Sequence, residues 1–291
     1  MKKMKKIAKP AKKAVKKKSV SVVKSKSGIK TASTKVRSVR SKKLIVANWK
    51  MNPGSIADAK KLFLATREIA RNSKGVMTIV CPPLVYLDTL RKLYTKSTVL
   101  GIGAQTMSTE RVGSVTGECS ASQIKSVGAG YVIVGHSEAR ARGESDHDVN
   151  HKIHEAILEG ITVILCIGEG ARDDDGDYLT FIRNQIFSAL SQVDRTKLGS
   201  IIIAYEPIWA IGQGRADIID GHEVHKMVLF IKKTLREIYK DDRAMQTKIL
   251  YGGSVVPKNA KELMHEGEVD GVLVGGASLR PRDFEAIVAA A

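Results

Sequence analysis

A single carboxylate stands at the end of an apolar run, directly before a segment that could cover it. Glu206 follows residues 200–204, a run of mostly β-branched side chains of the kind that is buried on both faces of a parallel sheet. Pro207 stiffens the chain after the carboxylate, and Gly212 leaves the far end free to swing. The apolar side chains at 208–211 could exclude water and so raise the basicity of the carboxylate. The pattern indicates a general base under a lid, although a strand end before an ordinary rigid turn would have the same pattern.

Other chemically useful residues stand at the ends of similar apolar runs. One run ends at Asn48 and is followed by Lys50, and another is followed directly by His136. Two later runs end in glycine-rich turns, at residues 252–254 and 275–276. If the runs are parallel strands, a base, an imidazole and an ammonium group meet at one face. The glycine-rich turns beside them would let backbone N–H groups approach a phosphate.

Eight such apolar runs alternate with longer segments of helical period. In residues 224–238, for example, apolar side chains recur at i, i+3, i+4 and i+7 and mark one buried helix face. Eight β-then-α units in about 250 residues predict a (β/α)8 barrel, because an open doubly wound sheet usually stops at five or six strands. No linker divides residues 41–291, which we expect to form one α/β domain. The expected strands are residues 44–48, 77–81, 99–105, 131–135, 161–167, 200–206, 247–252 and 270–275.

The positive charge of the chain is concentrated at its start. Residues 1–43 hold 18 of the 48 Lys and Arg and no acidic residue, so the remaining chain has 30 basic and 30 acidic residues and the net charge of +18 belongs to this segment. Residues 1–40 are Lys-rich and Ser-rich without an aromatic residue, and we expect a disordered tail. A polycation of this kind binds nucleic acid or anionic surfaces non-specifically. Organelle targeting is the alternative, although transit peptides favour Arg over Lys.

The composition places the folded part in a reducing compartment. Cys81, Cys119 and Cys166 are few, odd in number and without metal-ligand spacing, which fits free thiols in the cytoplasm. No stretch approaches the roughly 18 consecutive apolar residues of a membrane span. We therefore expect a cytoplasmic protein without a transmembrane segment.

Five motifs, in order and at the expected intervals, resemble the triosephosphate isomerase family. This family has the (β/α)8 architecture known as the TIM barrel, and the resemblance covers Leu44 to the C-terminus. It implies interconversion of dihydroxyacetone phosphate and D-glyceraldehyde 3-phosphate through an enediolate, in glycolysis and gluconeogenesis, without a cofactor. The motifs are residues 48–52 (NWKMN), 136–138 (HSE), 205–214 (YEPIWAIGQG), 251–255 (YGGSV) and 271–279 (GVLVGGASL).

The resemblance assigns a role to each of these residues. Glu206 would be the base, His136 a neutral electrophile and Lys50 a positive charge beside the enediolate oxygen and the phosphate. Asn48 would hold the substrate and Lys50 in register. Supporting residues would be Ser137 and Glu138, with Glu138 paired to Lys50. Backbone N–H groups for the phosphate would come from Gly212, Ser254, Gly275 and Gly276.

The resemblance also implies a homodimer. The segment 105–118 resembles the loop that reaches into the partner subunit, with Gln105 at its start and Thr116 at the position that crosses. A stretch of this length is long for a plain connection, which favours an interaction role. The chain departs from the family at Gln213, in the lid hinge, and at Ala139, after the His-Ser-Glu motif. Neither departure touches the proposed base, electrophile or lysine.

The sequence also allows three other hypotheses about function: a metal site, an aldolase and a non-catalytic binding protein. His147, His151 and His154 recur at i, i+4 and i+7, but they lie opposite the apolar face of the same helix, so we expect a solvated stripe and no metal site. A Schiff-base aldolase would need a desolvated lysine where Glu206 stands. A non-catalytic protein could use the barrel to present the basic tail to nucleic acid or membrane.

Overall fold

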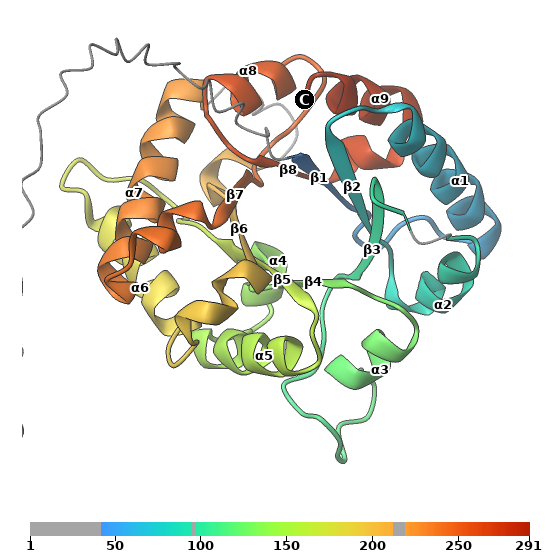
Figure 1. Cartoon of the computed structure of the whole chain (residues 1–291), viewed down its shortest axis with the longest axis horizontal. Coiled ribbons are helices and arrows are strands. Elements are labelled where there is room, and N and C mark those ends of the chain that lie inside the picture. Colours follow the sequence, from blue (N-terminus) through green and yellow to red (C-terminus); the bar gives the residue numbers. More distant parts are fainter. Residues whose placement is uncertain (1–41, 95–96, 212–218) are drawn as a thin grey trace, which may run out of the picture. The chain divides into compact units, whose positions relative to one another are not determined.

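Eight parallel strands close into a barrel in the order of the chain, and helices surround it (Figure 1). This computed structural model describes residues 42–94, 97–211 and 219–291. The predicted (β/α)8 TIM barrel is confirmed, and each end of the eight expected strands lies within one residue of the observed one. The strands are β1 (Lys43–Asn48), β2 (Val76–Cys81), β3 (Leu100–Ala104), β4 (Tyr131–Val134), β5 (Thr162–Ile167), β6 (Ile201–Tyr205), β7 (Lys248–Tyr251) and β8 (Gly271–Val274).

The helices begin at side chains that satisfy free backbone N–H groups. Ser55 caps the first helix and Asp220 caps the seventh, in each case through a side-chain oxygen. The helices are α1 (Ile56–Asn72), α2 (Leu84–Lys92), α3 (Ala121–Ser126), α4 (Ser137–Arg140), α5 (Asp146–Leu158), α6 (Asp177–Ala189), α7 (Gly221–Tyr239), α8 (Ala260–His265) and α9 (Pro281–Ala289). Short 3-10 helices are η1 (Arg195–Ser200), η2 (Ile208–Ala210), η3 (Asp242–Gln246) and η4 (Gly276–Leu279).

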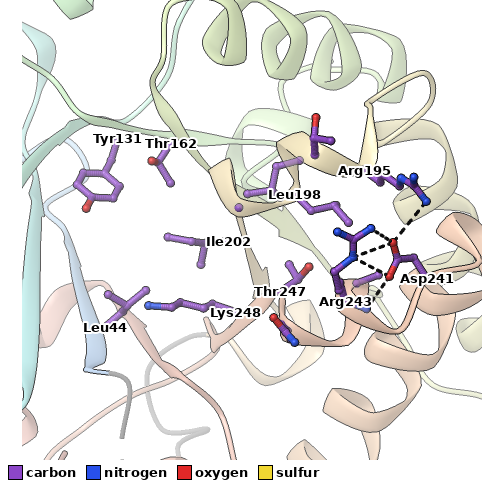
Figure 2. Close-up of a pocket in the computed structure, with 15 residues that line it drawn as sticks. Leu44, Tyr131, Thr162, Arg195, Leu198, Ile202, Asp241, Arg243, Thr247 and Lys248 are labelled. Carbon is purple, nitrogen blue, oxygen red and sulfur yellow. Dashed lines mark hydrogen bonds and ion pairs between the residues drawn. The ribbon is translucent and has the colours of Figure 1, made fainter. Parts of the chain in front are cut away.

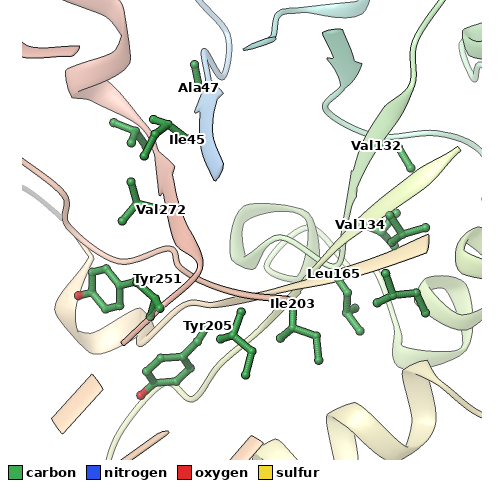
Figure 3. Close-up of a cluster of buried hydrophobic side chains, with 14 of the residues drawn as sticks. Ile45, Ala47, Val132, Val134, Leu165, Ile203, Tyr205, Tyr251 and Val272 are labelled. Carbon is green, nitrogen blue, oxygen red and sulfur yellow. The ribbon is translucent and has the colours of Figure 1, made fainter. Parts of the chain in front are cut away.

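Alternate strand residues enter two different cores. One cluster consists of strand side chains alone, including Val46 and Ala204, and fills the barrel interior. The other, which includes Ile45 and Ile203, packs the strands against the helices (Figure 3). Successive strand residues face opposite sides of a sheet, so a residue two positions beyond an interior one also faces inward. Asn48 follows Val46 by two positions and Glu206 follows Ala204 by two, which directs both polar side chains into the carboxyl end of the barrel.

Two glycines allow the backbone around Glu206 to come close to its neighbours. A Cβ atom on Gly168, just after β5, would lie 1.8 Å from the carbonyl oxygen of Glu206. A Cβ atom on Gly252, just after β7, would lie 2.8 Å from Glu206 Cγ. The amide of Glu206 also donates to the carbonyl of Ile167 at 2.7 Å. The ends of β5, β6 and β7 therefore fix where this carboxylate enters the barrel.

Some expectations fall outside the described residues. They concern the tail of residues 1–40, its boundary with the 41–291 domain, and Gly212 and Gln213 of the lid segment. What the sequence indicates for these residues remains a prediction. Within the described ranges, no helix is long and apolar enough to cross a membrane.

Replacing Gly168 with alanine should destabilise the barrel. The new methyl group overlaps the Glu206 carbonyl, and because the obstacle is backbone, the ends of β5 and β6 must separate. We expect the free energy of unfolding to fall by about 1–3 kcal/mol, measured by chemical denaturation. Gly170→Ala is the matched control, since a Cβ atom there meets no atom within 4 Å. Equal stability of the two variants would contradict the close approach.

Candidate active site

The carboxylate of Glu206 is buried at the carboxyl end of the barrel with only part of its hydrogen-bonding capacity used. Its side chain is 2% exposed, and Oε2 accepts a hydrogen bond from the Ser137 amide at 3.1 Å. Oε1 makes no hydrogen bond within the described part of the chain and lies 3.5 Å from His136 Nε2. Burial, together with the nearby Glu206 charge, raises the pKa of the Cys166 thiol, which keeps that neighbour neutral. A buried acceptor of this kind is suited to take up a proton.

His136 has its tautomer set by the start of the following helix. It stands at the N-cap of α4, and its Nδ1 accepts a hydrogen bond from the Glu138 amide at 3.1 Å. A ring nitrogen that accepts carries no proton, so the neutral imidazole holds its proton on Nε2. Nε2 is the atom that faces Glu206. His136 is therefore arranged to donate a hydrogen bond into the same space that the carboxylate faces.

Lys50 is held in an unfavourable backbone conformation by two polar side chains. Its φ is 52°, in the left-handed region that residues other than glycine rarely adopt. Asn48 Oδ1 accepts from the Lys50 amide at 3.0 Å. Gln105 Nε2 donates to the carbonyl of Lys50 at 2.9 Å and to that of Cys81 at 2.8 Å. Strain of this kind persists where surrounding contacts over-determine the conformation, and here they direct the lysine over the end of the barrel.

The Lys50 side chain links the imidazole region to the glycine-rich end of β8. Its ammonium group lies 2.5 Å from Glu138 Oε1, as the expected ion pair requires. Burial raises the pKa of Glu138, but the Lys50 hydrogen bond and charge outweigh it, and the pKa lies below its ordinary value. A Cβ atom on Gly275 would lie 3.4 Å from Lys50 Cε. The structure thus brings Lys50, Glu138 and Gly275 together.

The turns after β7 and β8 form the edge of this site. Gly275 joins β8 to the short helix η4, which begins at Gly276, and the Ser278 hydroxyl donates to the Gly275 carbonyl at 2.7 Å. The Ser254 carbonyl accepts from Asn259 Nδ2 at 3.0 Å, which fixes the turn after β7. Their backbones lie on the same face of the barrel as Glu206.

A buried network that the sequence patterns did not predict lies behind the site. Glu169, at the end of β5, is 1% exposed, and its Oε1 accepts from Tyr205 Oη at 2.9 Å and Trp209 Nε1 at 2.8 Å. Arg172 adds a third bond to the same oxygen at 3.1 Å, and its guanidinium stacks over the Trp209 ring. Burial and the Glu169 charge raise the pKa of Tyr205. The one available signal was a carboxylate directly after a strand, the same signal that identified Glu206.

The remaining candidates lie elsewhere. Thr116 is exposed on the loop between β3 and α3, which projects from the barrel (Figure 1), whereas Gln105 at the start of that loop contacts Lys50 of its own chain. Glu144 precedes α5, and its carboxylate pairs with Lys152 at 2.5 Å. His147 and His151 are exposed on α5. Across the described residues, no group of three or more His, Cys, Asp and Glu could hold a metal ion.

Comparisons with known proteins cover the whole barrel. A family model described as triosephosphate isomerase matches residues 43–291. The triosephosphate isomerase of Hydrogenovibrio crunogenus is 41% identical over 255 residues, which cover 85% of this chain and 97% of the relative. That of Thermoanaerobacter pseudethanolicus is 39% identical over 248 residues, covering 84% and 98%, and that of Clostridium novyi is 38% identical over 249 residues, covering 85% and 98%. The chain belongs to the triosephosphate isomerase family.

Proposed function

We propose that the chain interconverts dihydroxyacetone phosphate and D-glyceraldehyde 3-phosphate, as an aldose-ketose isomerase of glycolysis and gluconeogenesis, with Glu206 as the base. The observation that carries this proposal is the pairing of two groups in one buried space. Glu206 Oε1 has no hydrogen bond among the described residues and lies 3.5 Å from His136 Nε2, the nitrogen left to donate because Nδ1 accepts from the Glu138 amide. An acceptor and a donor therefore face the same space, in which a substrate would bind.

Each proton movement has a group to carry it. Glu206 takes a proton from the carbon beside the substrate carbonyl and becomes a carboxylic acid, while His136 Nε2–H donates to the carbonyl oxygen on which negative charge develops. The C–H electron pair forms the enediolate double bond. Glu206 then returns its proton to the neighbouring carbon, and the hydroxyl proton passes between the two oxygens beside His136. The sequence of steps changes no oxidation state of the protein and needs no cofactor.

The positive and N–H-rich edge of the site suits the phosphate. Lys50 lies beside Gly275, and its charge would stabilise both the phosphate dianion and the enediolate. The amides of Ser254, Gly275 and Gly276 would donate to the phosphate oxygens, with Gly212 as a further donor from the lid segment. Three residues would act by positioning. Asn48 and Glu138 bond to Lys50 through their side chains, and the Ser137 amide donates to Glu206.

The aldolase alternative finds no desolvated lysine beside Glu206 among the residues that the structure describes. The Lys50 side chain is 33% exposed and its ammonium group is paired with Glu138, so it is not the desolvated lysine that imine formation needs. Glu206 occupies the interior position at the end of β6. Proton transfer fits these side chains, and imine formation does not.

Glu206→Gln should abolish isomerisation while preserving the fold. Glutamine keeps the size of the side chain and an acceptor oxygen for the Ser137 amide, but it cannot act as a base. We expect kcat to fall by at least about 10²–10⁴-fold in a coupled assay with dihydroxyacetone phosphate. Glu285→Gln, on the exposed face of α9, is the matched control and should retain full activity. Equal turnover of wild type and Glu206→Gln would rule out this mechanism.

His136→Asn separates the chemical role of the imidazole from its role as a helix cap. Asparagine is a good N-cap, so α4 should keep its acceptor for the Glu138 amide. The variant loses the donor at the Nε2 position, and we expect kcat to fall about 10²–10³-fold with little change in thermal stability. A fully active His136→Asn enzyme would show that the imidazole acts only as a cap.

We propose that the enzyme is a cytoplasmic homodimer with a nucleic-acid-binding or anionic-surface-binding tail. Exposed apolar side chains support the dimer: Met51 is 93% exposed beside the site, and Val112 is 85% exposed on the projecting loop that carries Thr116. The cysteines are free thiols, which is consistent with the cytoplasm. The 18 positive charges of residues 1–43, without a counter-charge, support the role of the tail.

Removing residues 1–40 should separate catalysis and dimerisation from binding to nucleic acid. The truncated chain should turn over dihydroxyacetone phosphate at the rate of the full chain and sediment as a dimer, because the site lies wholly within the barrel. Salt-sensitive binding to DNA, measured by titration at low and moderate ionic strength, should disappear. DNA binding that survives truncation would contradict the role of the tail, and sedimentation as a monomer would contradict the dimer.

A further inference from the structure

A second cavity lies at the end of the barrel opposite Glu206. Its volume is about 460 Å³, and it opens among the first residues of five strands and the adjoining helices η1 and η3 (Figure 2). Ligand sites for small molecules usually occupy about 300–1,000 Å³, so the space is sufficient for one. The strand residues that line it are Leu44, Tyr131, Thr162, Ile201, Ile202 and Lys248.

The charged residues around this cavity leave a surplus of positive charge. Asp241 accepts hydrogen bonds from Arg243 Nε and Nη2 and lies 3.6 Å from Arg195 Nη1. The bonds from Arg243 lower the pKa of Asp241 to about 2. The carboxylate is therefore ionised throughout the physiological pH range and offsets only one of the two guanidinium groups. Lys248 adds a third positive charge, and its side chain makes no hydrogen bond or ion pair with the described residues. The cavity thus favours an anion.

The rest of the lining combines apolar side chains with the polar side chains of Thr162, Thr196 and Gln246, and the Thr247 hydroxyl in it is unsatisfied. Leu44 and Ile202 are each 5% exposed, and the Tyr131 ring lies beside them in the lining. Thr247 is 6% exposed, and its Oγ1 has no hydrogen-bond partner in the described structure. Figure 2 shows Thr247 between Lys248 and Arg243 in the lining of the cavity. Buried hydroxyl groups are rarely left unpaired, so this one indicates a missing partner.

We infer that this cavity binds a small carboxylic acid with an aromatic or branched apolar body. The carboxylate would accept from the Lys248 ammonium group and the Thr247 hydroxyl, and the body would pack on Leu44, Ile202 and Tyr131. The charges in the lining leave a surplus of two, but Asp241 contacts both guanidinium groups, and only the Lys248 ammonium group has no partner among the described residues. A monoanion therefore matches the site better than a phosphate dianion. The inference concerns the amino ends of the strands and is independent of the reaction proposed at their carboxyl ends.

Benzoate and benzamide are matched probes for this inference, since they share a ring and differ in charge. Isothermal titration of the full chain should show benzoate bound at least about tenfold more tightly than benzamide, because hydrogen bonds to charged groups are the stronger ones. Lys248→Met should weaken benzoate binding about tenfold and leave benzamide unchanged. Lys197→Met, an exposed lysine of η1 outside the lining, is the control and should bind both as the wild type does.

Gly199→Leu tests the location of the site in a second way. Gly199 lines the cavity, and a Cβ atom on it meets no atom within 4 Å, so a leucine can fill the space without a clash. Benzoate binding should be lost, while isomerase turnover stays at the wild-type value and shows that the barrel is intact. The inference is overturned if wild type does not bind benzoate, if benzamide binds as tightly, or if Lys248→Met and Gly199→Leu both bind benzoate normally.

Discussion

Backbone contacts between neighbouring strand ends hold a carboxyl side chain inside the barrel. Glu206 is 2% exposed, and burying a polar group to this degree is unfavourable unless other groups hydrogen-bond to it. Its amide bonds to Ile167 of β5, its Oε2 accepts from the Ser137 amide after β4, and Gly252 after β7 leaves room for its side chain. The ends of three strands other than β6 thus fix the position of the Glu206 carboxylate. Oε1 has no hydrogen bond among the described residues, and that oxygen is the reactive atom of the proposed mechanism.

Contacts from several strand ends also hold Lys50, on the cationic side of the site. Lys50 has a left-handed backbone, which Asn48 stabilises from within β1 and Gln105 stabilises from the end of β3. Glu138 then joins the Lys50 ammonium group to the segment that sets the His136 tautomer. Base, electrophile and cation are consequently held by one connected set of hydrogen bonds. A displacement at any one of these strand ends would alter the geometry of the others.

The sequence was sufficient to predict the strands and their inward-facing residues, because these depend on the spacing of apolar residues and on the order of the elements along the chain. Apolar runs located every strand to within one residue, and a period of two places Asn48 and Glu206 in the interior. Features that depend on residues far apart in the chain were not predictable in this way. Gln105 was predicted as a residue of the dimer loop, and its contact with Lys50, 55 positions away, follows only from closure of the barrel. The Glu169 network and the cavity around Lys248 likewise need the positions of several elements at once.

Exchange with solvent deuterium reports whether Glu206 moves a proton between adjacent carbons through an enediolate. The base exchanges its proton with solvent while the intermediate is bound. When wild type acts on dihydroxyacetone phosphate in D2O, NMR should therefore find deuterium on the carbon next to the carbonyl of D-glyceraldehyde 3-phosphate, and Glu206→Gln should form no labelled product. Unlabelled product from wild type, or labelling that persists in Glu206→Gln at the wild-type rate, would contradict the account.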